Sequence, residues 1–118
     1  MFQKLQSLFR KEQKTWLDSV SVKSGVKLNT LKPEILKALE IAQRAYTLFG
    51  FKLTVTSTND SKHMRGSKHY VDQAFDTRVW GIKLDTQKCI VDFAKAKLGK
   101  DYDIVIEKDH IHWEFDPK

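Results

Sequence analysis

The sequence has a single cysteine, Cys89, and no long run of apolar residues. One cysteine excludes an intramolecular disulfide, so the fold must be stabilised by a hydrophobic core, with or without a metal ion. Cys89 lies in a helical apolar pattern, and we expect it to be a buried small side chain. No stretch approaches the roughly 18 apolar residues of a membrane span. Internal repeats and low-complexity linkers are also missing, and 118 residues predict one domain.

The first residues lack the features of a secretory signal. Lys4 and Arg10 interrupt the apolar stretch, and no small-residue cleavage site follows it. We therefore expect a protein that is synthesised in the cytoplasm without a signal peptide. A hydrophobic content of 41% is too high for a disordered chain.

The net charge of +6 has two interpretations. It either keeps the protein soluble or attracts a polyanion, such as nucleic acid or the acidic polymers of a cell wall. The chain has no arginine-rich arm and no helix-turn-helix, so charge alone gives weak support for nucleic acid. We expect a monomer with no specific nucleic-acid partner and no transmembrane segment.

Apolar periodicity predicts an α+β domain with a small antiparallel sheet and packed helices. One helix is expected to begin after Thr30 as its N-cap, to hold Pro33 in its first turn and to end at Gly50. A short helix is predicted over residues 2–18, and residues 19–30 are expected to be irregular. In this division, residues 1–30 lead into a core of residues 31–118.

A second helix is predicted over residues 86–98, with Asp85 as its cap and Gly99 as its end. Trp80 and Trp113 are expected to lie in the core. Alternating or β-rich patterns predict strands over four segments: residues 51–58, 73–80, 102–107 and 110–115.

All four histidines fall inside two short patches, residues 61–76 and 107–112. Imidazoles with carboxylates at short spacing are the groups that a zinc site needs. In the first patch, a straight strand would separate His69 from Asp76 by about 23 Å. A turn at Val71-Asp72 must therefore fold the chain back if both residues bind one ion.

The two patches resemble the motifs of a known family. Residues 67–76, Ser-Lys-His-Tyr-Val-Asp-Gln-Ala-Phe-Asp, resemble S-x-H-x-x-G-x-A-x-D, and residues 109–112, Asp-His-Ile-His, resemble its second motif. These are motifs of the D-Ala-D-Ala metallopeptidases, which share a zinc-binding fold with the hedgehog signalling domain. The order of the motifs and the intervening helix also match, over roughly residues 53–117. The resemblance implies a hedgehog-like zinc fold with one zinc ion.

Carried over by position, the resemblance implies His69, Asp76 and His112 as zinc ligands. Asp109 would be the base that activates a water molecule and later protonates the leaving amine. His110 would lie beside the metal, where it stabilises the oxyanion or orients the substrate.

The second motif can be aligned in another register. Glu107-Lys-Asp-His110 also has the E-x-x-H spacing, with Glu107 as the base and His110 as the ligand. Both histidines would share one face of a strand. We prefer His112 with Asp109, because the D-H-x-H form ends on its second histidine.

Other positions are less well defined by the family pattern. Ser67 is expected to hydrogen-bond within the site, and His63 is either a substrate-side residue or an exposed loop histidine. Asp72 replaces the motif's glycine, although aspartate tolerates the left-handed backbone region better than most residues. Arg65 and Arg78 are candidates for the arginine with which many members bind a substrate carboxylate, but neither aligns with it.

The resemblance implies a zinc-dependent peptidase, either a carboxypeptidase or an endolysin-like endopeptidase. Its partners would be the stem peptides of bacterial peptidoglycan. Small size, positive charge and the missing signal suggest a phage or prophage lysis enzyme that reaches the cell wall through a holin or at virion entry. The alternative is a non-catalytic zinc domain with a structural or partner-binding role, as in hedgehog. A carboxylate at Asp109 or Glu107 favours the enzyme.

Overall fold

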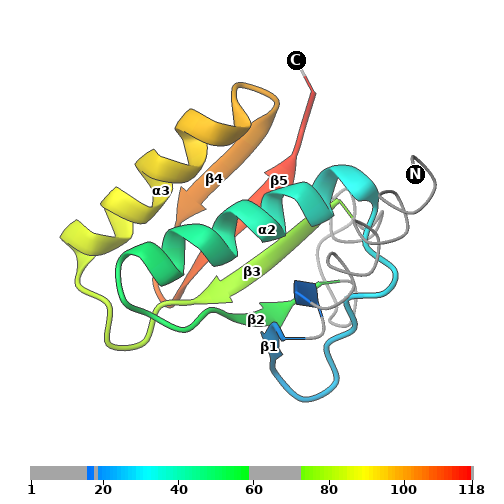
Figure 1. Ribbon diagram of the computed structural model, residues 1–118, viewed down its shortest axis with the longest axis horizontal. Helices are drawn as coiled ribbons and strands as arrows, with labels where there is room; N and C mark the ends of the chain where they lie inside the picture. The colour runs from blue at the N-terminus through cyan, green and yellow to red at the C-terminus, as the bar shows by residue number, and fades with distance from the viewer. Residues whose placement is uncertain (1–15, 18, 59–72, 118) are drawn as a thin grey trace, which may run out of the picture.

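The computed structural model describes residues 16–17, 19–58 and 73–117, which form an α+β fold (Figure 1). No helix in these ranges is long and apolar enough to span a membrane. In chain order the elements are β1 (Ser21–Val22), α2 (Pro33–Leu48), β2 (Thr54–Ser57), β3 (Ala74–Arg78), α3 (Leu84–Leu98), β4 (Tyr102–Ile106) and β5 (His110–Phe115).

The five strands form one mixed sheet in the order β1-β2-β3-β5-β4. Strand β1 pairs with β2 in parallel, whereas the other three pairs are antiparallel. The sheet is therefore mixed, not antiparallel as expected, and residues 19–30, which were expected to be irregular, contain the two-residue strand β1. The physical reason is the connection: α2 lies between β1 and β2 in the chain and supplies the crossover that a parallel pair requires.

The N-cap of helix α2 lies two residues later than predicted. Lys32, not Thr30, is the N-cap residue, and its backbone is extended, with φ −72° and ψ 156°. Pro33 explains this start, because the residue before a proline is disfavoured in the helical region. Gly50, with φ +86°, lies just beyond the helix as predicted.

Helix α3 ends at the predicted glycine but begins earlier than expected. Lys83 is its N-cap residue, and Asp85 lies within the first turn instead of capping it. A carboxylate there still interacts favourably with the positive end of the helix dipole. Gly99 takes a positive φ of 83° after the last helical residue.

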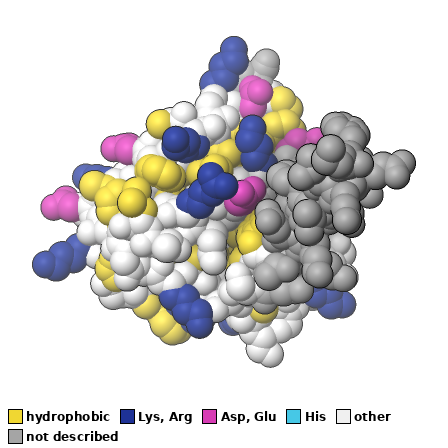
Figure 2. Space-filling model, in the orientation of Figure 1, with side chains coloured by type: hydrophobic (Ala, Val, Ile, Leu, Met, Phe, Trp, Pro, Cys, Tyr) yellow, Lys and Arg dark blue, Asp and Glu magenta, His cyan; other side chains and the backbone are white. Residues whose placement is uncertain are grey.

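Both helices pack on one face of the sheet, where the hydrophobic core lies. Phe75 from β3 and Trp113 from β5 are fully buried there, with parallel rings 5.6 Å apart. The helical face in Figure 2 displays hydrophobic and charged side chains, and among the described residues no histidine is visible on it. The opposite face of the sheet carries the charged residues of β3 and the histidines of β5, because side chains alternate along a strand.

Two predicted core residues are exposed. Trp80 is 71% exposed, because it continues the even-numbered positions of β3 that point away from the helices. Cys89 is also exposed, because the buried positions of α3 are those of Gln87, Ile90, Val91, Ala94 and Leu98. The prediction for Trp113, in contrast, is confirmed.

Candidate metal and catalytic site

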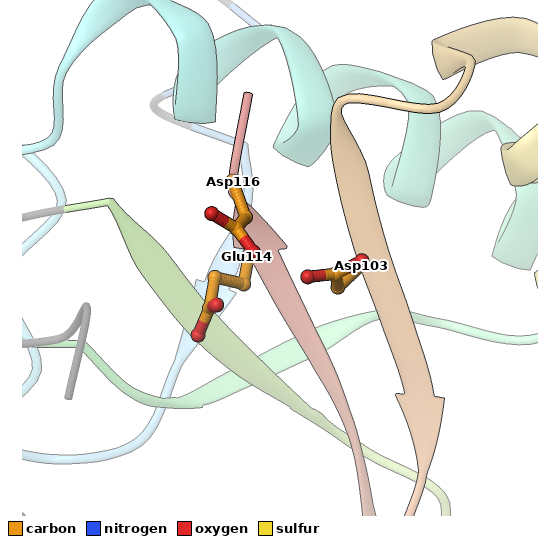
Figure 3. Close-up of side chains that lie close together, drawn as sticks. All are labelled: Asp103, Glu114 and Asp116. Carbon is orange, nitrogen blue, oxygen red and sulfur yellow. The ribbon is translucent and has the colours of Figure 1, made fainter. Parts of the chain in front are cut away.

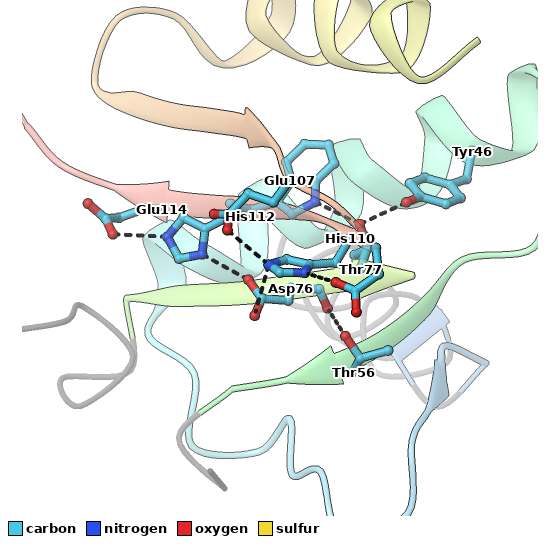
Figure 4. Close-up of polar contacts among 10 residues, drawn as sticks. Tyr46, Thr56, Asp76, Thr77, Glu107, His110, His112 and Glu114 are labelled. Carbon is cyan, nitrogen blue, oxygen red and sulfur yellow. Dashed lines mark hydrogen bonds and ion pairs between the residues drawn. The ribbon is translucent and has the colours of Figure 1, made fainter. Parts of the chain in front are cut away.

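Asp76 and His112 meet on the open face of the sheet, at neighbouring strands. They are direct partners in the register between β3 and β5. Asp76 Oδ1 lies 2.8 Å from His112 Nδ1, although the two residues are 36 positions apart in the sequence (Figure 4). Their side chains are only 10% and 19% exposed. The structure thus brings together one predicted ligand from each motif.

A buried hydrogen-bond chain on the helix side supports these two strands. Trp113 Nε1 donates to Thr77 Oγ1 over 2.9 Å, which links β5 to β3. Tyr46 of α2 donates its hydroxyl proton to the carbonyl oxygen of Arg78 at 2.9 Å. Because that proton is then used, Thr77 is the donor in its 2.8 Å bond with Tyr46. Burial raises the pKa of Tyr46 to about 12, so its hydroxyl keeps this proton.

His112 has a second carboxylate on its other ring nitrogen. Glu114 Oε1 lies 3.1 Å from Nε2, so the imidazole bridges Asp76 and Glu114. Burial alone would lower the pKa of His112. The hydrogen bonds and negative charges of the two carboxylates outweigh this effect and raise the pKa to about 9.

His110 lies beside this pair on the same face of β5. Its Nε2 is 3.8 Å from Asp76 Oδ2 and 3.6 Å from Glu107 Oε2. Its Nδ1 is 2.6 Å from Asp109 Oδ1. Both candidate histidines therefore face Asp76, and the choice between the two registers of the second motif stays open.

Asp109 and Glu107 lie in the tight connection between β4 and β5. The connection is closed by a 2.8 Å hydrogen bond from the backbone N–H of Glu107 to the carbonyl of His110. The hydrogen bond with His110 lowers the pKa of Asp109, so its exposed carboxylate is ionised at neutral pH. An ionised carboxylate can accept a proton, as a general base must.

The donors of Asp76 and His112 fit a zinc ion. Two ligands of a tetrahedral zinc with bonds near 2.1 Å lie about 3.4 Å apart, so a small side-chain rotation would admit the ion between them. Glu114 on the remaining nitrogen of His112 is the kind of partner that metal-binding histidines usually have. The third predicted ligand, His69, lies outside the described residues.

Three carboxylates that the sequence reasoning missed form a second group. Ligand atoms of Asp103, Glu114 and Asp116 all lie within 4.8 Å of one another (Figure 3). Within the described ranges, this is the group of three His, Cys, Asp or Glu residues whose ligand atoms lie close enough together to hold a metal ion. Oxygen ligands are not specific for zinc. The alternation of Glu114 and Asp116, with Asp103 opposite Glu114, is the signal that could have revealed it.

A pocket of about 340 Å³ opens beside His110. Arg78 lies in it, directly across the β3–β5 register from His110, and its guanidinium carbon is 3.7 Å from the centre of the Trp80 ring. The sequence reasoning selected three of the lining residues, Arg78, Asp109 and His110, and missed the other four. The full lining among the described residues is Lys23, Thr56, Ser57, Arg78, Trp80, Asp109 and His110.

The remaining predicted residues of the first motif lie outside the described residues. These are His63, Arg65, Ser67, His69 and the turn at Val71-Asp72. Their predicted roles stay predictions. The structure brings together Asp76, Arg78, Glu107, Asp109, His110 and His112.

Comparisons with known proteins give no relative from which a function could be transferred. No protein-family model, no curated protein and no solved structure matches the chain significantly. The resemblance to the D-Ala-D-Ala metallopeptidases therefore rests on the two motifs, and its consequences belong to the proposal that follows.

Proposed function

We propose that the protein is a zinc-dependent peptidase that hydrolyses peptide bonds in bacterial peptidoglycan. The observation that carries this proposal is the contact between Asp76 and His112. Each comes from a different histidine-containing patch, and their ligand atoms lie 2.8 Å apart on adjacent strands. A hedgehog-like zinc fold with His69 as third ligand is part of the same proposal.

The residues that would hold zinc are His69, Asp76 and His112. When bound, zinc supplies a Lewis acid that lowers the pKa of water and polarises a carbonyl group. Asp109 would take the proton from the attacking water and return it to the leaving amine. Its contact with His110, which in turn faces Asp76, places it beside the proposed zinc ligands.

His110 is proposed to hold Asp109 in place and to face the substrate. Its Nδ1 bonds to Asp109, while its Nε2 points toward Asp76 and Glu107. Glu107 is the alternative base if His110 is the metal ligand. The pocket beside His110, with Arg78 and Lys23 in its lining, would receive the peptide next to the bond that is cleaved.

The substrate class follows from the motif resemblance and is supported by charge. A net charge of +6 would concentrate the protein on the anionic polymers of a bacterial wall. The proposed site of action is therefore the cell wall, as for an endolysin. Stem peptides are the proposed partners.

The direct test is digestion of purified peptidoglycan followed by mass spectrometry of the released fragments. We expect new peptide termini in the presence of zinc and none after treatment with a chelator. Asp109→Asn should reduce the release by at least about 100-fold, the usual contribution of a general base. Asp92→Asn, a change at an exposed position of α3, is the matched control and should release fragments as the wild type does.

Two outcomes would contradict the proposal. Stoichiometric zinc with no fragments from any type of peptidoglycan would indicate the non-catalytic zinc domain instead. Equal release by Asp109→Asn and Asp92→Asn would remove Asp109 from the mechanism, and Glu107→Gln would then test the other register of the second motif.

A further inference from the structure

Glu114 contacts His112 on the side of the imidazole that faces away from Asp76. Glu114 Oε1 lies 3.1 Å from Nε2, while Nδ1 is the nitrogen that meets Asp76. Both side chains are about four-fifths buried, so the contact is shielded from solvent. The two residues are separated by one position on β5 and therefore project from the same face of the sheet.

This contact determines which ring nitrogen can bind a metal. A neutral imidazole carries one N–H and one lone pair, and a carboxylate accepts a hydrogen bond but donates none when ionised. When zinc takes the place of the proton between Nδ1 and Asp76, Glu114 still accepts from Nε2–H, so the lone pair that binds the metal is on Nδ1. That nitrogen points toward the oxygen of Asp76, the other predicted ligand in the described part of the chain.

We propose that Glu114 is a positioning residue that fixes the Nε2–H tautomer and the ring orientation of His112, so that Nδ1 binds zinc. The inference rests on the proposed zinc site and deepens it. Outer carboxylates of this kind typically change metal affinity by about 10–100-fold when they are removed.

Charge must be separated from hydrogen bonding in the test. Ligand atoms of Asp103 and Glu114 lie within 4.8 Å of each other, and Asp103 is the register partner of Glu114 on β4. Asp103→Asn therefore removes one negative charge from the same neighbourhood without touching the bond to His112. Glu114→Gln removes the charge and keeps an oxygen acceptor, whereas Glu114→Leu removes both.

The experiment measures zinc affinity of the full chain by competition with a chelator of known affinity. We expect Glu114→Leu to weaken zinc binding by about 10–100-fold. Glu114→Gln should keep most of the wild-type zinc affinity, and the affinity of Asp103→Asn should remain within a few-fold of the wild type. Equal affinity of Glu114→Leu and wild type, or equal losses in Glu114→Leu and Asp103→Asn, would overturn the proposal.

A spectroscopic measurement on the wild type keeps the proposal testable if Glu114→Leu fails to fold. Long-range ¹H–¹⁵N correlation spectra of the zinc-loaded protein should show the His112 proton on Nε2 and the metal on Nδ1. The opposite assignment, or zinc bound without His112, would overturn it. Neither readout requires peptide cleavage, so a protein that shows the expected tautomer but releases no fragments would contradict only the proposed function.

Discussion

Thr77→Val should destabilise the folded protein by about 2–3 kcal/mol, because valine keeps the shape of threonine and removes its hydroxyl. The indole N–H of fully buried Trp113 then has lost its acceptor at 2.9 Å, at a cost of about 1–3 kcal/mol. The bond that Thr77 makes with Tyr46 at 2.8 Å is lost as well and adds about 1 kcal/mol. Burying a methyl group in place of the hydroxyl offsets part of this sum, by up to about 1 kcal/mol.

The assay is urea unfolding followed by tryptophan fluorescence and circular dichroism, with the free energy of unfolding taken by linear extrapolation. Thr56→Val on the neighbouring strand is the matched control. Its hydroxyl makes a 3.4 Å bond to the carbonyl of Asp76, and the side chain is only part-buried, so its loss should cost under about 1 kcal/mol. A Thr77→Val protein that loses less than about 0.5 kcal/mol, or no more than Thr56→Val, would refute the proposed hydrogen-bond chain.

Further predictions concern pH, the thiol and the pocket. In chelator-treated protein, the contribution of protonated His112 to the free energy of unfolding should be fully present below pH 6.5 and lost as the pH rises through about 9, because its pKa is raised. Urea midpoints measured across this range test it. A pH profile that is the same in His112→Gln as in the wild type would contradict the assignment. Exposed Cys89 should react with a thiol reagent in the folded state. Labelling that occurs only after denaturation would contradict its exposed position. Arg78→Gln should raise the KM for the peptide substrate more than it lowers kcat, because Arg78 lines the pocket without contacting the predicted zinc ligands in the bonds described; Lys88→Gln on α3 is the charge-matched control, and equal kinetics of the two variants would exclude Arg78 from substrate binding.

The predicted elements were largely correct where short-range physics determines the structure. Gly50 and Gly99 end the two helices because each takes a positive φ that suits glycine. The strand predicted over residues 73–80 is present as β3, Ala74–Arg78. These features follow from backbone sterics and side-chain period, which a sequence displays directly.

Errors arose where the outcome depends on long-range pairing. The parallel partnership of β1 with β2 joins residues more than thirty positions apart, and a two-residue strand has no pattern of its own. Trp80 was assigned to the core from its residue type, and Cys89 from an apolar helical pattern. Both are exposed, because Trp80 follows the outer face of β3 and Cys89 lies on the outer side of α3. Face, not hydrophobicity, decides burial at these two positions.

The candidate site was predictable in its members but not in its connections. The residue types and spacing of the two patches selected Asp76, His110 and His112, which the sheet register brings together. Glu114 escaped notice, because a single glutamate after the second motif has no signal until the strand face and the ring nitrogens are known. The same holds for Lys23, which reaches the pocket from the loop after β1.

The central claim is that Asp76 and His112 hold zinc, and its most direct test is the zinc content of purified variants measured by mass spectrometry. The account predicts one zinc ion per wild-type chain, loss of zinc in Asp76→Ala and His112→Ala, and retention in His110→Ala. Zinc that persists in His112→Ala and disappears in His110→Ala would contradict the assignment and transfer the metal to the register of Glu107 and His110.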